Sequence, residues 1–364
     1  MATKTKNKDV PAYLKKTVDK YGDIIKSGNK VLEEKSDYKV ISISPALDIG
    51  LGGGVREGCW LTLTGDPKSG KTTTAMQIAA NCLAEGRKVI YIDAEGRLKD
   101  LNFQVAGLTP DDMVVIAPVD KPLSAEVLLE TAYKLLCDPE YHGAVLIIDS
   151  VSSLIAEKEL DGDFSPKRAG LPKILSIFTK KVGQLLPNQR GLIIAITHFI
   201  ANTSGFGKSK MSDGGIKIQY QADTRLEIAH GGEGNPAVKP MVDDNGKQIG
   251  QKINWKVLCS SMGPPGGNIQ SYIRYGHGID KTQEVIELAL DLGLIDQRGA
   301  WFNCVFMAQM PEIAKKIKPE VDFDKPEEVE KAFKYQGMSK MRVLFDENPE
   351  LATKLESIIK VSLF

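Results

Sequence analysis

Short apolar runs alternate with longer amphipathic segments through the middle of the chain. The early runs contain almost no polar residue, a pattern typical of parallel strands buried on both faces of a sheet. The later runs alternate apolar and polar positions more regularly, which indicates an antiparallel edge of the same sheet. The expected strands are Trp60–Thr64, Val89–Asp93, Val114–Pro118, Val145–Asp149, Leu192–Thr197, Arg225–Ala229, Ile253–Leu258 and Ile269–Tyr275.

Helical periodicity fills the intervals between these strands. The segment Leu171–Leu186 has apolar residues three or four positions apart, which is the spacing of a helix that packs one face on a core. Strands that alternate with helices predict a doubly wound, mostly parallel α/β sheet with helices on both faces.

The pattern divides the chain into three parts, which are residues 1–36, 37–280 and 281–364. The first part is Lys-rich, and a helix is expected after Pro11. Because one amphipathic helix cannot bury its apolar stripe alone, we expect this helix to dock on another surface.

The last part predicts a smaller, α-rich domain. Apolar spacing from Val285 to Leu292 indicates one helix, and Asn348-Pro349 is a typical N-cap and first residue for the final helix. The Lys- and Glu-rich stretch 312–340 is expected to be a solvated helical insertion with a loop.

Composition limits the classes of function. The chain has 364 residues, no apolar run long enough to span a bilayer, and no apolar segment near its polar N-terminus. Five scattered cysteines without a CxxC pair argue against a disulfide framework or a zinc site and favour the reducing cytoplasm. Lys plus Arg and Asp plus Glu are equal at 47 each, so any contact with DNA must come from a local basic surface.

A phosphate-binding loop follows the first long strand. The segment Gly65-Asp66-Pro67-Lys68-Ser69-Gly70-Lys71-Thr72 matches GxxxxGK[ST], and Thr73 continues into a helix. Backbone N–H groups of such a loop surround the phosphates, the lysine lies between the β- and γ-phosphates, and the threonine hydroxyl binds Mg²⁺. With a strand before it and a helix after it, a chance glycine-rich turn is a poor alternative. The sequence predicts binding of ATP with Mg²⁺.

Carboxylates at strand ends complete the predicted chemistry. Asp149 ends an apolar strand and is expected to hold the Mg²⁺ shell together with Thr72. Glu95 lies two residues past Asp93 and is the candidate for orienting and activating the attacking water. Asp93 is the rival for this role, and an ordinary surface glutamate is the plain alternative.

His198 directly follows the strand Leu192–Thr197. The carboxyl end of this strand is expected at the phosphate crevice, because ligands of open α/β sheets bind there. A contact with the γ-phosphate and an ordinary strand-end histidine are equally supported by the residues alone.

Two long connections leave the same edge of the predicted sheet. They are residues 160–172, LDGDFSPKRAGLP, and residues 199–215, FIANTSGFGKSKMSDGG. The second suits single-stranded DNA, because its lysines can meet phosphates and its aromatic side chain can contact bases. A disordered surface loop is the alternative. The residues concerned are Phe206, Lys208, Lys210, Gly214 and Gly215.

Taken together, these motifs resemble the RecA family, including phage recombinases of the UvsX type. The likeness runs from about residue 42 to residue 305 and returns at 341–363. It is carried by Ser44–Gly54 (SPALDIGLGGG), the phosphate loop, Tyr91–Glu95 (YIDAE), Ile148–Val151 (IDSV), Ile196–His198 (ITH), Gly214-Gly215, Ile273–Ile279 (IRYGHGI) and Gly299–Trp301 (GAW). The order and spacing of these segments make the resemblance specific.

The resemblance implies a role for each matching residue. Glu95 falls on the family's catalytic glutamate, and His198 on the residue that senses the γ-phosphate and relays it to the DNA loop. The two long connections fall on the two DNA-binding loops, and Arg168 and Lys181 fall near the DNA path. Residues 1–36 resemble an N-terminal helix and strand that dock on the neighbouring protomer through Ile24 or Ile25.

Two departures from the family pattern stand out. Bacterial relatives reach the neighbour's ATP with basic residues, whereas the matching stretch here is LCSSMGPP, residues 258–265, without a base. It is more similar to the Pro-containing cap of archaeal and eukaryotic recombinases, with Ser260 and Pro264 at the interface and bound K⁺ supplying the charge. Lys256 or Arg274 is the rival source. The family's tyrosine beside adenine is replaced by Asn102, which leaves Tyr275 as the expected nucleotide contact.

The expected fold is therefore a RecA-like core with an N-terminal oligomerisation helix and a small α-rich C-terminal domain. The expected function is a DNA-dependent ATPase that forms a helical filament on single-stranded DNA and pairs it with homologous duplex. Candidate further partners are mediator and single-strand-binding proteins, and no membrane is expected. The alternatives are a ring-forming helicase with a RecA-like core and a regulatory relative that does not exchange strands.

Overall fold

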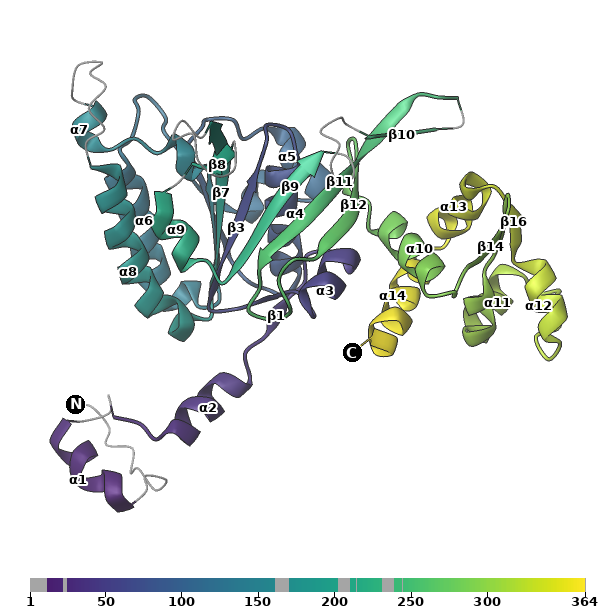
Figure 1. Ribbon diagram of the computed structural model, residues 1–364, viewed down its shortest axis with the longest axis horizontal. Helices are drawn as coiled ribbons and strands as arrows, with labels where there is room; N and C mark the ends of the chain where they lie inside the picture. Colours follow the sequence, from purple (N-terminus) through teal and green to yellow (C-terminus); the bar gives the residue numbers. More distant parts are fainter. Residues whose placement is uncertain are drawn as a thin grey trace. The chain divides into compact units, whose positions relative to one another are not determined.

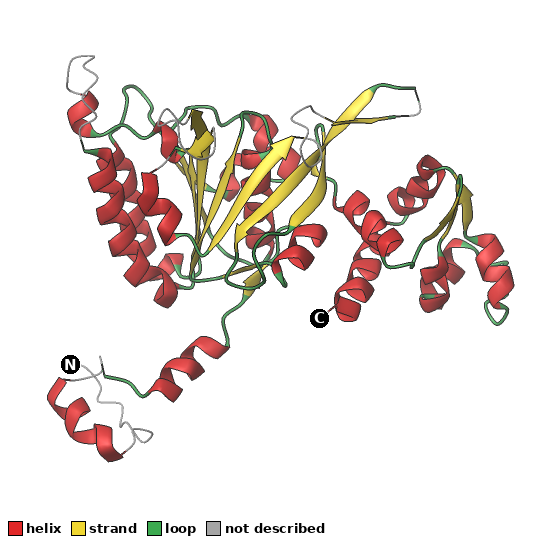
Figure 2. Cartoon of the chain, in the orientation of Figure 1, coloured by secondary structure: helices red, strands yellow, loops and turns green. Residues whose placement is uncertain are grey.

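The computed structural model describes residues 12–21, 25–160, 170–201, 210–213, 215–230, 239–243 and 245–363. The chain forms two compact units, Met1–Lys39 and Val40–Phe364. Figures 1 and 2 show the elements of each unit.

The first unit contains helices α1 (Ala12–Tyr21) and α2 (Gly28–Ser36). The predicted helix after Pro11 is confirmed by α1. The second element differs from the expected strand, because Ser27 caps a helix by accepting a hydrogen bond from the Lys30 amide at 3.2 Å. Of the two isoleucines expected to dock on a neighbouring protomer, Ile25 precedes α2, and Ile24 lies outside the described residues.

The second unit is built on a large mixed sheet with the strand order β13-β12-β11-β9-β3-β7-β6-β4-β5, while β10 pairs with β11 and β8 with β7. The strands are β3 (Cys59–Gly65), β4 (Val89–Asp93), β5 (Val114–Ile116), β6 (Val145–Asp149), β7 (Leu192–Ala201), β8 (Lys210–Ser212), β9 (Thr224–His230), β10 (Lys239–Val242), β11 (Gln248–Cys259), β12 (Asn268–Arg274) and β13 (Gly278–Ile279).

The predicted order and type of these strands are confirmed. The strands β3, β4, β5, β6, β7 and β9 pair in parallel. The antiparallel part of the sheet begins at β11, directly after the parallel strand β9. The alternating pattern of β9 reflects partial exposure of one face at the end of the parallel block.

Helices cover both faces of this sheet (Figure 1). One face packs on α3 (Pro45–Leu51), α4 (Lys71–Ala84) and α5 (Asp100–Ala106). The other packs on α6 (Ala125–Cys137), α8 (Leu171–Gln189) and α9 (Gly215–Gln221). Burial of the strands on both sides explains why their sequences are continuously apolar.

Smaller elements complete the core. A two-stranded antiparallel pair joins β1 (Val40–Ile41) to β2 (Val55–Arg56). The short helix α7 covers Glu157–Leu160, and single 3₁₀ turns cover Pro110–Asp112, Pro139–Tyr141, Val151–Ser153 and Val305–Gln309. No helix in the described part of the chain is long and apolar enough to cross a membrane.

The C-terminal elements have a hydrophobic cluster of their own. The helices are α10 (Lys281–Asp291), α11 (Pro311–Ile317), α12 (Pro326–Ala332), α13 (Met338–Glu347) and α14 (Pro349–Leu363), with an antiparallel sheet of β14 (Asp296–Arg298), β15 (Trp301–Asn303) and β16 (Lys334–Gln336).

Two expectations for this region need correction. The stretch 312–340 is not simply solvated, because Ala314, Val329 and Phe333 are buried in the C-terminal cluster. The final helix begins at Pro349 as predicted, but Nδ2 of the Asn348 side chain donates backward to the Leu344 carbonyl at 2.8 Å and so closes α13.

A buried carboxyl joins the C-terminal elements to the core. Glu284 on α10 accepts hydrogen bonds from the Ser271 hydroxyl of β12, the Ala46 amide (3.0 Å) and the Ser44 hydroxyl (3.2 Å). Burial raises the pKa of Glu284 to about 7, although these three bonds favour the charged form. On α14, the Lys360 ammonium pairs with Asp48 of α3 at 3.0 Å.

Candidate active site

The phosphate loop joins β3 to α4 and has room only for glycine at two positions. A Cβ atom on Gly70 would lie 2.3 Å from Ile273 Cδ1, and Gly70 has a φ of +104°. A Cβ atom on Gly65 would lie 2.5 Å from the Ile228 carbonyl oxygen. The loop can therefore curl tightly before the N-terminus of α4, where backbone N–H groups favour an anion.

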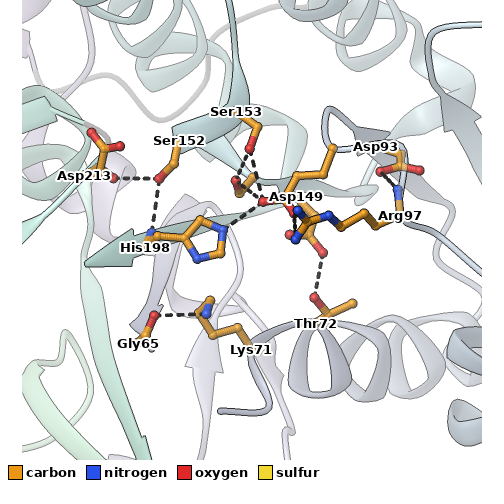
Figure 3. A network of polar contacts seen from close by, with 12 residues as sticks. Gly65, Lys71, Thr72, Asp93, Arg97, Asp149, Ser152, Ser153, His198 and Asp213 are labelled. Atoms are coloured by element: carbon orange, nitrogen blue, oxygen red, sulfur yellow. Dashed lines mark hydrogen bonds and ion pairs between the residues drawn. The ribbon is translucent and has the colours of Figure 1, made fainter. Parts of the chain in front are cut away.

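Lys71 is buried within this curl. Its ammonium donates to the carbonyl oxygens of Gly65 (3.0 Å) and Asp66 (2.9 Å), as Figure 3 shows for Gly65. Burial lowers the pKa of Lys71, while the nearby carboxylates of Asp149 and Glu95 oppose that shift. The Ser69 hydroxyl is fully buried and has no hydrogen-bond partner among the described residues. A loop with an unsatisfied hydroxyl and a buried cation fits a bound phosphate chain.

The two predicted magnesium ligands meet at the start of α4. The Thr72 hydroxyl donates to Asp149 Oδ2 at 2.7 Å, and the Tyr91 hydroxyl donates to the same oxygen at 2.7 Å. Burial raises the pKa of Asp149, and these two hydrogen bonds oppose the shift. No group of three or more His, Cys, Asp or Glu side chains suited to a metal occurs in the described ranges. One hydroxyl and one carboxylate fit Mg²⁺, which takes its remaining ligands from phosphate and water.

One carboxylate oxygen of Glu95 has three hydrogen-bond partners. Its Oε1 accepts from the Ser150 hydroxyl (2.7 Å), the Ser153 hydroxyl (3.1 Å) and His198 Nε2 (2.8 Å). Burial raises the pKa of Glu95, but these hydrogen bonds outweigh it and the pKa lies below its usual value. The carboxylate is therefore ionised near neutral pH, as a group that accepts a proton from water must be.

Asp93, the rival base, has a different task in this geometry. Its two carboxylate oxygens accept from the backbone amides of Arg97 (3.1 Å) and Leu98 (3.0 Å), and the residue is buried. Both oxygens fix the loop that follows β4, so Glu95 is the better-placed candidate base.

His198 connects this carboxylate with the returning end of the second long connection. The His198 amide donates to the Ser152 hydroxyl at 3.1 Å, and that hydroxyl donates to the Asp213 carbonyl at 3.2 Å. The Asp213 amide in turn donates to the His198 carbonyl at 2.7 Å. The ring of His198 thus contacts Glu95, and its backbone contacts Asp213 near the end of residues 199–215. The sequence could suggest this link only through the resemblance.

Two further polar links join the phosphate loop to the strand β8. The Lys210 ammonium lies 2.7 Å and 3.0 Å from the two carboxylate oxygens of Asp66. A row of hydroxyls runs from Thr64 to Thr197 (2.8 Å) and on to Ser212 (3.0 Å). The ion pair was not predicted, because Lys210 was assigned to DNA alone.

A cavity of about 570 Å³ opens over the loop. Tyr275 and Asn102 contribute to its wall, and the Tyr275 hydroxyl accepts from Gln248 Nε2 at 2.8 Å. The half-exposed ring of Tyr275 offers an apolar face to a base. The remaining lining residues are Pro67, Lys68, Gly70, Lys71, Thr72, Thr73, Tyr91, Asp93, Glu95, Arg97, Leu98, Asp149, His198, Gln251 and Ile273.

The cap segment lies at the other end of the sheet. Strand β11 runs antiparallel to β9, so its last residue Cys259 pairs with Arg225, near the start of β9, whereas Gly65 pairs with Ile228. The Ser260 hydroxyl accepts from the amides of Met262 (3.1 Å) and Gly263 (3.2 Å). The exposed Pro264 follows. This segment cannot serve the phosphate loop of its own chain.

The remaining predicted residues that the structure describes do not line the cavity. Lys181 lies midway along α8 with its ammonium 5.2 Å from the Tyr133 ring centre. Arg274 lines a separate cleft with Lys252 and Arg342. Gly215 begins α9. The residues Arg168, Phe206, Lys208 and Gly214 lie outside the described residues.

Comparison with known proteins agrees with this geometry. Residues 9–280 match the family described as RecA N-terminal domain. The chain is 30% identical to Protein RecA of Streptococcus pyogenes serotype M5 over 353 residues, covering 91% of this chain and 89% of that protein. It is 32% identical to Protein RecA of Streptococcus uberis over 296 residues, covering 79% and 75%. Protein RecA of Streptococcus parasanguinis is 31% identical over 296 residues, covering 79% and 74%.

Proposed function

We propose a function for this chain on the basis that it belongs to the RecA family of recombinases. It is a DNA-dependent ATPase that forms a helical filament on single-stranded DNA and catalyses homologous pairing and strand exchange. The observation that carries the proposal is the link from Glu95 through His198 and Ser152 to Asp213. It connects a candidate hydrolytic carboxylate with the loop expected to bind DNA.

Hydrolysis would use residues of the cavity in distinct roles. Mg²⁺, held by Thr72 and Asp149, would neutralise charge on the phosphate oxygens. Glu95 orients a water molecule and accepts one of its protons. The water oxygen bonds to the γ-phosphorus while the bond from that phosphorus to the β–γ bridging oxygen breaks, and the bonding pair leaves with ADP. The products are ADP and inorganic phosphate.

Coupling to DNA follows from the contacts of His198. A γ-phosphate near Glu95 competes for its hydrogen-bond partners, and His198 is the partner whose backbone also contacts Asp213. A shift of this histidine therefore reaches the end of residues 199–215. In this account Phe206, Lys208 and Lys210 contact the single strand, with Arg168 and Lys181 near the DNA path.

Polymerisation would use two separate parts of the chain. The helical first unit, through Ile24 or Ile25, docks on a neighbouring copy, and the cap segment with Ser260 and Pro264 meets the neighbour's ATP. The antiparallel course of β11 supports the second contact, because it carries the cap away from the chain's own phosphate loop. Bound K⁺ at the cap would supply positive charge that its side chains lack.

The test is a set of reactions with the purified full chain. Single-stranded DNA should stimulate ATP hydrolysis, and the protein should exchange a labelled strand into homologous but not heterologous duplex. DNA-stimulated hydrolysis without exchange would favour the regulatory relative. Unwinding of a forked duplex by closed rings would favour the helicase. Hydrolysis that ignores DNA would contradict the proposal.

A further inference from the structure

Arg97 is a cation in the cavity that no sequence motif singled out. Its Nη1 lies 3.0 Å from Glu95 Oε2, and its side chain is 80% exposed. Figure 3 shows Arg97 among the side chains of this polar network. Glu95 Oε1 is occupied by Ser150, Ser153 and His198, so Arg97 covers the other oxygen of the candidate base.

The backbone of Arg97 is fixed although its side chain is not. Asp93 accepts from the Arg97 amide at 3.1 Å and from the Leu98 amide at 3.0 Å. Gly96, with a φ of +64°, reverses the chain between Glu95 and Arg97. These contacts hold the backbone of Arg97 at the cavity wall, while its long side chain can exchange one hydrogen-bond partner for another.

The ion pair with Glu95 is easy to exchange. Arg97 is 80% exposed whereas Glu95 is 13% exposed, so solvent screens the pair from the arginine side, and ordering a long exposed side chain costs entropy. A triphosphate offers Arg97 a stronger partner, since guanidinium groups bind phosphate oxygens through two parallel hydrogen bonds. Removal of the guanidinium would also free Glu95 Oε2 to contact water.

The positions of the lysine and arginine side chains indicate why Arg97 would be needed at the γ-phosphate. The cap segment of residues 258–265 carries no Lys or Arg, so it brings no basic side chain to a neighbour's phosphates. Within the described cavity wall the lysine and arginine side chains are Lys68, Lys71 and Arg97. Of these, Arg97 is the one bonded to the candidate base.

We propose that Arg97 is a catalytic residue that binds the γ-phosphate of ATP from the same chain and leaves Glu95 when it does so. This inference rests on the proposed ATPase function. Arg97 supplies positive charge where charge develops during phosphoryl transfer, which is the role that an inserted arginine has in other phosphate-loop enzymes. Its departure couples binding of the γ-phosphate to exposure of the base.

The test compares Arg97→Ala and Arg97→Lys with Arg298→Ala in the full chain. Arg298 is a matched control, because it is 83% exposed and pairs with Asp296 at 2.9 Å in the C-terminal sheet. Calorimetry measures the affinity for Mg-ADP and for Mg-ADP with aluminium fluoride, which mimics the transferring phosphoryl group. Single-turnover hydrolysis with single-stranded DNA is measured in parallel.

Arg97→Ala should keep Mg-ADP affinity within about twofold, because the γ-position is empty in that ligand. It should lose at least about tenfold of the extra affinity given by aluminium fluoride and at least about tenfold in single-turnover rate. Arg97→Lys should recover part of both, and Arg298→Ala should match the wild type.

Two results would overturn the inference alone. Unchanged aluminium fluoride affinity and rate in Arg97→Ala would leave Arg97 without a role, and faster hydrolysis would make it a lock on Glu95. Absence of hydrolysis by the wild type would instead overturn the proposed function and this inference with it.

Discussion

Charged side chains surround the cavity where β3 ends, whereas the cap segment, residues 258–265, has only neutral side chains. Lys71, Glu95, Arg97 and Asp149 line the first region. Residues 258–265 form the second, without a charged side chain. Under the proposed function, we expect the charge for phosphate chemistry to come from within one protomer and the cap to bring a bound cation to the neighbour's ATP.

The largest expected effect comes from removing charge at the crowded edge. Lys71→Ala should raise the Kd for Mg-ATP by about a hundredfold or more, because it deletes the buried cation of the phosphate loop. Equilibrium binding of a fluorescent ATP analogue measures this. The control is Lys88→Ala, whose ammonium pairs with Glu140 outside the cavity. ATP turnover at the wild-type rate in Lys71→Ala would refute the assignment of this loop.

Removal of the candidate base should separate binding from chemistry. Glu95→Gln should keep ATP affinity within a few-fold and slow hydrolysis by about a hundredfold or more, the scale of a lost general base. Its complexes with DNA should also last longer. Rapid-quench single-turnover assays measure the rate, with Asp93→Asn as the comparison. A larger loss in Asp93→Asn than in Glu95→Gln would make Asp93 the base and reverse our assignment.

Phe206 belongs to the segment 199–215, which directly follows His198 of the cavity wall, yet its replacement should not affect nucleotide affinity. Phe206→Ala should weaken binding to single-stranded DNA by about tenfold while ATP binding stays unchanged. Fluorescence anisotropy at fixed salt measures the DNA affinity. If DNA binding were unaltered, these residues would be an ordinary surface loop.

The smallest expected effect concerns the neutral edge. Hydroxyl and carbonyl oxygens at the cap are hard donors suited to a metal cation, so DNA-stimulated ATPase should be a few-fold faster in K⁺ than in Na⁺ or a bulky organic cation. Ser261→Lys restores a basic side chain and should abolish this dependence. Equal wild-type rates in all three salts would reject bound cations and turn attention to Lys256 and Arg274.

Much of the fold was predictable because the sheet is buried on both faces. Strands β4 and β6 have the predicted bounds, since an apolar run that ends in Asp is both a buried strand and its boundary. The stretch 312–340 was misjudged for the opposite reason. Its many charged residues hide the few apolar ones, such as Phe333, that pack into the C-terminal cluster.

The site was predictable where a motif fixes the spacing and hidden where only tertiary contact does. The phosphate loop gave Lys71 and Thr72 directly, whereas the Asp66–Lys210 ion pair joins residues 144 positions apart. Arg97 follows a glycine in a short loop, and neither its neighbours nor any periodicity relates it to Glu95 Oε2. The two backbone bonds of Asp93 were equally invisible, because an aspartate at a strand end is compatible with several roles.

Electron microscopy would show whether ATP binding assembles this chain into a filament on single-stranded DNA, as we propose. The full chain should be imaged with single-stranded DNA and a non-hydrolysable ATP analogue, alongside Lys71→Ala. We predict helical filaments that hold stretched DNA for the wild type and none for the variant. Closed rings, or the same isolated particles with and without nucleotide, would contradict the account.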